Sequence, residues 1–540
     1  MLPFQAPVDD ILFSLNHVAG AARLPDWDAD LIREIVQQFA RFAEGQVAPV
    51  DEAADLTGCR LENGRVTLPA GLVRAYQAYA EQGWPALTLP EEAGGQGLSG
   101  PVEGAVTEIF AGASHALQMV TGLVPGAART VARFGTPAQQ ARWLPRLASG
   151  EWLATMALTE PGAGSDLSGV RMRATAGPDW RLSGEKIFMS GGDQDLTPRI
   201  LHLVLARSGE TNSGVRGLSL FLVPSHDDSG ARLPVSVTRI EEKMGLHASP
   251  TCQMLFDAAP AELLGAEGKG LNAMFTMMNH ARLDVALQGV AHAARATHIA
   301  ASYAASRKQG AAGAMLDTHA DVRRMLDEAR TLALGTRALI HLALVELALN
   351  ERPDLVDFLT PVCKFTGTEA GVTAANLGIQ VLGGYGYLRE YRVEQVLRDA
   401  RVAPLYEGAN GIHALTLATR LLRNANGAAA DAFADFLADV PDVQAVWQDA
   451  RARMLAAPDP TPAAHAFMLL TSQAALAVIW RRLQAVATDA PDPATLTRLA
   501  RYQAAAQPMT LRYLADRVAL DLAATSAPPN DPAAAAPAHP

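Results

Sequence analysis

The stretch MALTEPGAGSDLSG, residues 156–169, lies where the character of the 540-residue chain changes. Upstream, from Asp30 to about Gly150, apolar residues recur at spacings of three and four, as on one face of a helix. Downstream, to about Leu264, Gly, Pro, Asp and Asn separate short β-like runs at 152–158, 180–190, 202–208, 218–225 and 233–240, which is typical of strands and turns. The sequence therefore predicts a helical N-terminal domain, residues 30–151, followed by a compact β domain, residues 152–264.

Helical periodicity returns after the β domain. Four candidate helices, the last after Glu407, predict a four-helix bundle over residues 265–425. The first three are residues 271–310, 319–350 and 361–384. We expect an N-terminal extension at 1–29, an additional helical domain at 426–525 and a disordered tail at 526–540. The predicted fold class is mainly α with a central β domain.

Composition and charge exclude several functional classes. The formal net charge of −11 and the lack of clustered Lys and Arg argue against nucleic-acid binding. Cys59, Cys252 and Cys363 lie far apart without C-x-x-C spacing, so we expect no zinc or redox site. The N-terminus lacks a basic region before a long apolar run, and the apolar segments are too short for a membrane span. The predicted compartment is the cytoplasm.

Two short stretches carry candidate chemistry. In TEPGAGSD, residues 159–166, Gly162 and Gly164 allow unusual turns that expose N–H donors, while Thr159 and Ser165 offer hydroxyls. This loop is either a ligand cradle or a Pro-Gly turn between strands. In LYEGANGI, residues 405–412, Glu407 is a lone acid among apolar residues. It is exposed, lies at the start of the next helix, or performs chemistry.

Six stretches in order and spacing resemble the acyl-CoA dehydrogenase family over roughly residues 30–425. They are TEPGAGSD (159–166), SGEKIFMSGG (183–192), EEKMGLHASPT (241–251), ELLGAEGKGL (262–271), QVLGGYGYLREYRVEQVLRDAR (380–401) and LYEGANGI (405–412). The resemblance implies a helical domain, a β-barrel-like middle domain and a C-terminal four-helix bundle. It also implies FAD between the last two, often completed by a neighbouring subunit. HASPTC and the extra C-terminal region are similar to the subgroup that includes 3-methylmercaptopropionyl-CoA dehydrogenase.

The resemblance implies FAD-dependent oxidation of an acyl-CoA thioester to trans-2-enoyl-CoA, as in fatty acid metabolism. Glu407 matches the base that removes the α-proton, and flavin N5 accepts the β-hydride. The backbone N–H of Glu407 and a flavin ribityl hydroxyl match the donors to the thioester carbonyl. Some family members carry the base immediately before Arg282, but Ala281 stands there and cannot take a proton.

The resemblance also implies contacts to substrate and cofactor. The substrate-binding positions are Ser165, Arg282, Tyr406 and Gly408, although an arginine on a helix is more often a solvated or paired residue. The FAD-binding positions are Leu158, Thr159, Gly164, Ser165, Phe188, Ser190, Arg307, Gln309, Gln380, Gly383 and Gly384. Phe188, Met189 and Ser190 replace the usual Trp-Ile-Thr, and Ala409 replaces the usual Thr.

Substrate and partners stay open in the sequence. Met274, Phe275, Met277 and Met278 either line the acyl pocket or are ordinary core residues. The family passes electrons to an electron-transferring flavoprotein, whereas related oxidases use oxygen. The alternatives to a dehydrogenase are an acyl-CoA oxidase or monooxygenase on the same fold, and a non-catalytic flavoprotein that binds a macromolecular partner. A homo-oligomer is expected, with a dimer favoured.

Overall fold

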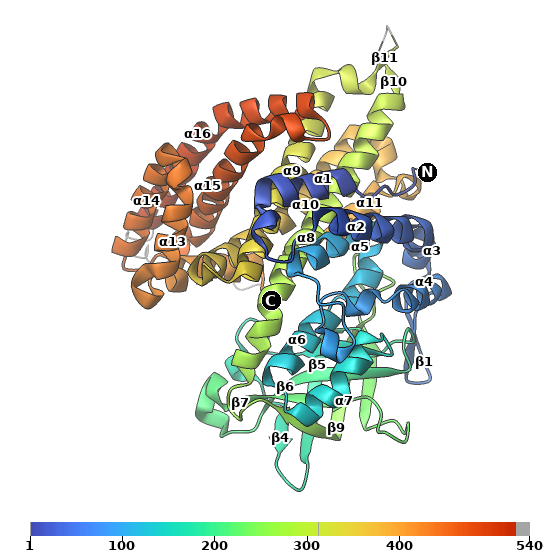
Figure 1. The fold of residues 1–540 in the computed structure, drawn as a ribbon. Helices are drawn as coiled ribbons and strands as arrows, with labels where there is room; N and C mark the ends of the chain where they lie inside the picture. Colours follow the sequence, from blue (N-terminus) through green and yellow to red (C-terminus); the bar gives the residue numbers. More distant parts are fainter. Residues whose placement is uncertain (1, 311–312, 525–540) are drawn as a thin grey trace, which may run out of the picture.

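The computed structural model describes residues 2–310 and 313–524. Helices form the upper part of the molecule and one β unit forms the lower end (Figure 1). This arrangement confirms the predicted fold class. The tail predicted at 526–540 lies outside the described residues.

Seven helices and one small hairpin precede the β unit. The helices are α1 (Val8–Phe13), α2 (Ala29–Phe42), α3 (Ala48–Thr57), α4 (Ala70–Glu81), α5 (Gly100–Thr121), α6 (Val124–Phe134) and α7 (Pro137–Ala148). The hairpin, β1 (Arg60–Glu62) with β2 (Arg65–Thr67), corrects the prediction of a purely helical segment. Its turn carries Asn63 and Gly64, both with positive φ, which suits a tight hairpin turn.

The β unit is a closed ring of strands. It contains β3 (Trp152–Ala157), β4 (Arg173–Thr175), β5 (Trp180–Ser190), β6 (Arg199–Arg207), β7 (Leu218–Pro224), β8 (Val235–Ile240) and β9 (Thr251–Leu264). The strand order is β3-β6-β4-β5-β9-β7, β6 also pairs with β7, and β8 pairs with β9. The predicted barrel-like character is therefore confirmed.

Sequence reasoning found five of these seven strands and missed β4 and β9. β9 is the longest strand, but its centre reads as a turn because it contains Asp257, two alanines and Pro260. Ala258 has φ +50° there, so the chain departs from regular strand geometry. The long antiparallel pairing with β5, from Trp180↔Ala261 to Ser190↔Thr251, outweighs this weak local propensity.

Long helices α8 (Gly270–Ser306), α9 (Ala320–Leu349) and α10 (Pro353–Leu382) form the core of the bundle. The third prediction began too late, because Pro361 lies inside α10 rather than at its start. The next segments are α11 (Val393–Ala400) and α12 (Asn410–Thr416). The small hairpin β10 (Lys308–Gln309) and β11 (Ala314–Met315) follows α8.

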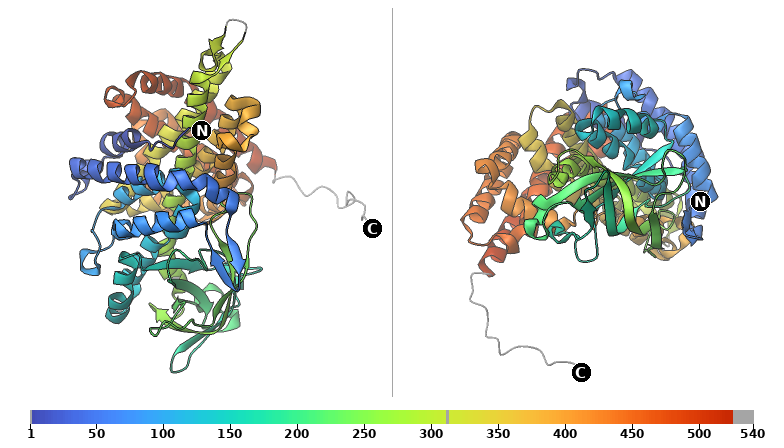
Figure 2. Two further views of the ribbon diagram at one scale, coloured as in Figure 1. Left: turned by 90° about the vertical axis from the view of Figure 1, so that its right-hand side faces the viewer. Right: turned by 90° about the horizontal axis from the view of Figure 1, so that it is seen from below.

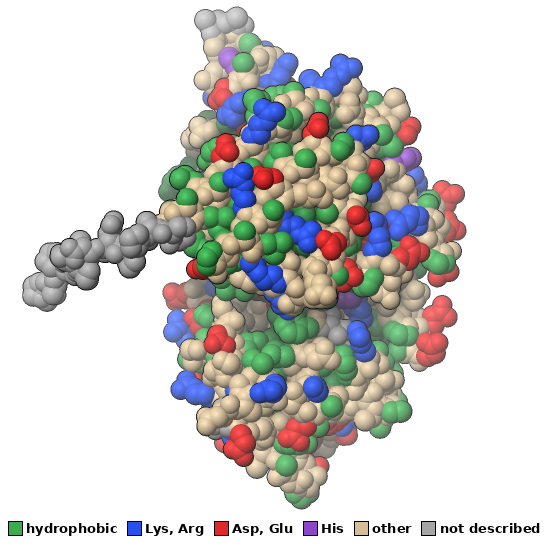
Figure 3. Space-filling view, turned by 90° about the vertical axis from the view of Figure 1, so that its left-hand side faces the viewer, with side chains coloured by type: hydrophobic (Ala, Val, Ile, Leu, Met, Phe, Trp, Pro, Cys, Tyr) green, Lys and Arg blue, Asp and Glu red, His purple; other side chains and the backbone are tan. Residues whose placement is uncertain are grey.

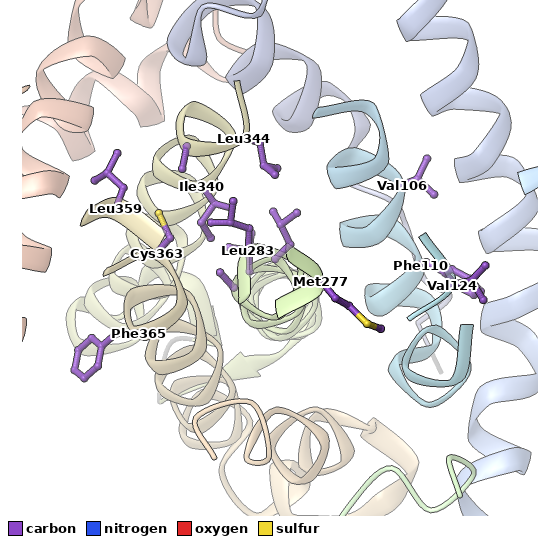
Figure 4. Packing of buried hydrophobic residues seen from close by; sticks show 14 of the residues in the cluster. Val106, Phe110, Val124, Met277, Leu283, Ile340, Leu344, Leu359, Cys363 and Phe365 are labelled. Atoms are coloured by element: carbon purple, nitrogen blue, oxygen red, sulfur yellow. The ribbon is translucent and has the colours of Figure 1, made fainter. Parts of the chain in front are cut away.

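The α8 helix runs through the centre of the core. Figure 4 shows Leu283 of α8 among side chains of α9 and α10, and Met277 directed toward the N-terminal helices. Glycines let α8 and α10 touch closely: a Cβ on Gly289 would lie 2.0 Å from the Gly367 carbonyl oxygen. This close crossing places the part of α10 around Lys364 and Gly367 beside Ala286 and Gly289 of α8.

An additional helical unit follows the bundle: α13 (Ala428–Phe436), α14 (Pro441–Ala456), α15 (Ala464–Ala485) and α16 (Pro493–Ala524). Seen from below, it lies on the opposite side of the β unit from the N-terminal helices (Figure 2). Two stretches, 320–349 and 461–485, are long and apolar enough to cross a membrane. Most of each is buried inside the protein, as in core helices of a soluble protein.

Candidate functional site

Glu407 lies in a strained turn between α11 and α12. Its φ is +52° and that of Gly408 is +88°, so both have left-handed backbone, which is unusual for a glutamate. A Cβ on residue 408 would lie 2.9 Å from Nε2 of His413, so only glycine fits there. His413 Nε2 is also 3.1 Å from the Glu407 carbonyl oxygen. The turn is held in place by α12.

The Glu407 carboxylate points into the protein. Its Oε2 atom is buried and has no hydrogen-bond partner among the described residues. The alternative of a helix-start residue is not supported, because α12 begins at Asn410 with Ala409 as N-cap and no side-chain cap. Burial raises the pKa of Glu407, while the positive charges of Arg282 and Lys364 oppose that rise. The site thus contains a buried acid between two cations.

Lys364 of α10 connects this turn to the bundle, and sequence reasoning missed it. Its ammonium donates hydrogen bonds of 2.9 Å to the Gly408 carbonyl and of 2.9 Å to Asn410 Oδ1. Asn410 in turn donates to Thr368 Oγ1 at 3.0 Å and to Glu369 Oε1 at 2.7 Å. Burial lowers the pKa of Lys364 to about 7, although the carboxylates of Glu407 and Glu369 counteract it.

Tyr406 leads into a buried polar network. Its hydroxyl donates to Gln288 Oε1 and lies 3.3 Å from His115 Nε2. Gln288 Nε2 donates to Gln118 Oε1 at 2.8 Å. His115 Nδ1 lies 2.8 Å from His292 Nε2, so α5 and α8 are joined twice behind Tyr406.

The sequence carried a signal for part of this network. Asp284, Gln288 and His292 are spaced by four on a largely apolar helix, which places three polar groups on one buried face. Burial lowers the pKa of His115 to about 4 and that of His292 well below its ordinary value, so both imidazoles are neutral near pH 7. They form hydrogen bonds here without adding charge.

The predicted flavin-binding residues of the β unit come together at one edge. The Ile187 N–H donates to the Thr159 carbonyl at 2.9 Å, which joins the end of β3 to β5. Lys186 Nζ donates to the Leu158 carbonyl at 2.9 Å and to Glu160 at 2.8 Å. Phe188 has φ +57° and is 61% exposed. This edge therefore presents an aromatic face beside two backbone segments held by a buried ion pair.

The loop next to this edge is open to solvent. Gly164 lies against Thr159, with its Cβ position 3.8 Å from Thr159 Cγ2. Gly164 and Ser165 are exposed, and Ser190 at the end of β5 is half-buried. The space-filling view shows a waist between the helical half and the β unit (Figure 3). The ligand-cradle interpretation of the loop stays a prediction.

The β edge and Glu407 are connected through α5. The Cβ position of Gly191, next to Ser190, lies 3.3 Å from Val120 of α5. Two residues earlier on α5, Gln118 accepts the hydrogen bond from Gln288, which binds Tyr406. Three contacts therefore link the predicted flavin edge to Tyr406, the residue before the predicted base.

The other predicted cofactor residues form a separate group. Arg307, Gln309, Gln380, Gly383 and Gly384 line one cavity of about 550 Å³. The Arg307 guanidinium lies 5.5 Å from the centre of the Tyr385 ring. This cavity follows the C-terminal end of α8, whereas Gly270 at the N-terminal end packs against β7. The helix between these two ends has 37 residues and is about 55 Å long.

The methionines at the start of α8 have different surroundings. Met274 and Met277 are buried, and Met277 packs against Gly126 of α6. This supports the core interpretation for both. Phe275 is 38% exposed and lies under the Arg282 guanidinium, 5.9 Å from ring centre to carbon.

The residues present fit FAD. The β edge offers an exposed aromatic side chain and open loop backbone, and the second cavity offers an arginine for a phosphate and two glycines without close neighbours. Among the described residues, no group of His, Cys, Asp and Glu is arranged to hold a metal ion.

Three family profiles match the chain. They are described as acyl-CoA dehydrogenase N-terminal domain (residues 30–151), middle domain (155–259) and C-terminal domain (268–422). The chain is 40% identical over 466 residues to 3-methylmercaptopropionyl-CoA dehydrogenase from Ruegeria pomeroyi. That match covers 81% of this chain and 79% of the relative.

Two solved structures match beyond the four-helix bundle. Caenorhabditis elegans ACDH-11, in complex with C11-CoA, superimposes with a TM-score of 0.80 at 20% identity, covering 93% of this chain and 91% of that one. Bacillus anthracis acyl-CoA dehydrogenase, complexed with FAD, gives 0.75 at 20% identity over 96% and 91%. At this identity the likeness concerns the fold, and it extends into the additional helical unit.

Proposed function

Because this chain belongs to the acyl-CoA dehydrogenase family, whose members oxidise a CH–CH bond with FAD as cofactor, we propose that Glu407 is its catalytic base. The proposed reaction removes the α-proton of an acyl-CoA thioester and yields the trans-2-enoyl-CoA. When bound, FAD supplies the acceptor for the β-hydride.

The buried Oε2 of Glu407, without a hydrogen bond in the described chain, is the observation that carries the proposal. A base must offer a free lone pair to a substrate proton, and this atom does so. Burial raises the pKa of the acid, which favours its taking up a proton. The positive charges of Arg282 and Lys364 oppose the rise and favour the ionised carboxylate that a base needs.

The left-handed turn also orients the backbone. With φ positive at Glu407 and Gly408, we propose that the Glu407 N–H faces the thioester carbonyl and stabilises the negative charge that develops on its oxygen. Gly408 lets the thioester approach closely, Tyr406 excludes water, and Arg282 and Ser165 bind the CoA side of the substrate. These roles follow the family pattern.

We propose that each FAD is held by residues of two subunits. The β edge, with Leu158, Thr159, Gly164, Ser165, Phe188 and Ser190, would hold the flavin half. The cavity of Arg307, Gln309, Gln380, Gly383 and Gly384 follows the opposite end of α8 from Gly270, which packs against the β unit, and its lining includes no residue of the β edge. We therefore propose a homo-oligomer, at least a dimer, in which this cavity binds the adenine-dinucleotide half of the neighbouring subunit's cofactor.

A short acyl group is the proposed substrate class. The Gln118–Gln288 and His115–His292 pairs join α5 to α8 behind Tyr406 and leave little room there for a long hydrocarbon chain. The relative from Ruegeria pomeroyi, named for a short sulfur-containing acyl-CoA, agrees with this. An electron-transferring flavoprotein is the proposed electron acceptor, and a cytoplasmic location and a role in fatty acid metabolism stay predictions from the sequence.

The test is Glu407→Gln, with Glu328→Gln on the exposed surface of α9 as matched control. We expect Glu407→Gln to keep its flavin spectrum and to lose acyl-CoA-dependent flavin bleaching by about 10²- to 10⁴-fold, as is typical of a general base. Glu328→Gln should behave as wild type. Unchanged bleaching by Glu407→Gln would refute the assignment.

A further inference from the structure

A cavity of about 350 Å³, distinct from the one that Arg307 lines, lies away from Glu407 between α8, α9, the N-terminal segment and the start of α16. Part of its wall comes from residues 4–13 and 490–496. Both segments lie outside the matched family ranges, which begin at residue 30 and end at 422. The N-terminal segment crosses α9 (Figure 1), where Ser14 Oγ lies 2.9 Å from His341 Nδ1. The cavity is thus built where the two flanking segments cover the bundle.

Two arginines lie in this wall, and one of them has a buried donor that the protein does not use. Arg337 is 1% exposed, and its Nε and Nη2 pair with Glu108 at 2.9 and 2.6 Å. Its Nη1 has no hydrogen-bond partner within the described residues, and the nearest carboxylate, of Asp10, is 3.8 Å away. Arg295 lies 5.0 Å from the centre of the Phe4 ring, and none of the described residues accepts a hydrogen bond from it. The Nη1 atom of Arg337 is buried, whereas Arg295 is half-buried. Leaving the buried donor of Arg337 unpaired is costly, so an acceptor is expected there.

The remaining wall is largely apolar. Small side chains leave the space: Ala291 and Ala294 on α8 and Ala333 on α9, with Leu334 and Leu496 nearby. A ligand that fits must combine an anionic head with a hydrocarbon body. The acids Asp10, Glu108 and Asp492 also line the cavity, so three arginines, including Arg330, face three carboxylates. Because the arginines and carboxylates balance, the lining suits a ligand with one negative charge better than a phosphate monoester, which carries two.

We propose that this cavity binds a medium-chain carboxylate, with the head group on Arg295 and Arg337 and the chain along the alanines of α8 and α9. A carboxylate accepts charge-assisted N–H bonds from guanidinium groups, which suits the unused Nη1 of Arg337 and the Arg295 side chain in the same wall. At about 30 Å³ per water-sized group, the volume holds about a dozen non-hydrogen atoms. Octanoate, with ten, fits this limit.

The test is calorimetric titration of octanoate into the full-length protein loaded with FAD, in the presence of saturating acyl-CoA so that the substrate site is filled. The variants are Arg295→Gln, which removes the free guanidinium, and Ala294→Leu, which fills the cavity without changing charge. The matched control is Arg323→Gln, an exposed arginine on α9 outside the cavity. Arg337 is left intact, because its removal would strand the buried Glu108.

We expect about one octanoate per chain, binding at least about tenfold weaker in Arg295→Gln, since hydrogen bonds to charged groups contribute that much. Ala294→Leu should also weaken it, and Arg323→Gln should not. No octanoate binding, equal affinity in both cavity variants, or equal affinity for 1-octanol would each overturn the proposal. The site does not rest on the proposed catalysis: octanoate binding should persist in Glu407→Gln.

Discussion

Replacing Lys364 with methionine tests how the bundle controls the proposed base. The ammonium binds the Gly408 carbonyl and Asn410 Oδ1, both at 2.9 Å, and its charge favours the ionised form of Glu407. Methionine has a similar length and suits a buried site, but it removes both the donor and the charge. The variant therefore isolates this one contribution to the site.

The expected magnitude follows from the two lost interactions. A nearby opposite charge lowers the pKa of a carboxylate, so the removal of the Lys364 ammonium should raise the pKa of Glu407. The base must be ionised to act, so the acid limb of the pH profile of kcat/KM should move to higher pH. The Gly408 carbonyl also loses its buried donor, which costs about 1–3 kcal/mol and lowers kcat/KM at its optimum roughly tenfold to hundredfold.

The assay is flavin bleaching by acyl-CoA across the pH range in which the protein stays folded. Thr366→Val is the matched control: it removes a buried side-chain hydrogen bond on the same helix, to Val362, without contact to the Glu407 turn. An acid limb that stays in place in Lys364→Met, or that moves equally in Thr366→Val, would refute the reasoning.

Three further perturbations follow from the same geometry. Gly408→Ala should cost at least tenfold in kcat/KM and lower the melting temperature, because the position has φ +88° and a Cβ would lie 2.9 Å from His413; normal activity would contradict the tight turn. Gln288→Leu should remove the Gln118–Gln288 hydrogen bond between α5 and α8 and shift the chain-length profile of flavin bleaching toward longer acyl-CoAs. An unchanged profile would place the acyl pocket elsewhere. Arg307→Met should release FAD more readily on dilution, while the rate of acyl-CoA-dependent bleaching per bound flavin stays unchanged. Full retention of FAD by this variant would argue that no second subunit takes part in the cofactor site.

The parts of the site that sequence motifs predicted are those with local causes. Glu407, Gly408, Thr159 and Phe188 were predicted from short motifs that resemble those of the family, and the structure shows left-handed backbone at Glu407, Gly408 and Phe188. Their roles in the site stay predictions. The strands β5 and β7 were found to the residue or nearly so, since their apolar runs are bounded by turn residues. In these places the local sequence is sufficient.

The missed parts depend on contacts between distant segments. Lys364 looks like an ordinary helix lysine until the α8–α10 crossing buries it against a turn 44 residues away. His115 and His292 are 177 residues apart and pair only because α5 and α8 pack side by side. β9 was missed for a related reason, because its pairing partner β5 outweighs its weak local preference.

Asp284 shows how a second buried acid can coexist with the proposed base. It lies on the same face of α8 as Gln288, and burial, with the nearby charge of Glu103, raises its pKa to about 8. The group is therefore mostly protonated at pH 7 and adds little negative charge near Glu407, whose proton affinity would otherwise rise. As pH rises, Lys364 loses its positive charge around pH 7 and Asp284 gains its negative charge around pH 8, and both changes raise the pKa of Glu407. The surroundings therefore treat the two acids differently: Asp284 is mostly neutral at pH 7, whereas the positive charges of Arg282 and Lys364 favour the ionised form of Glu407.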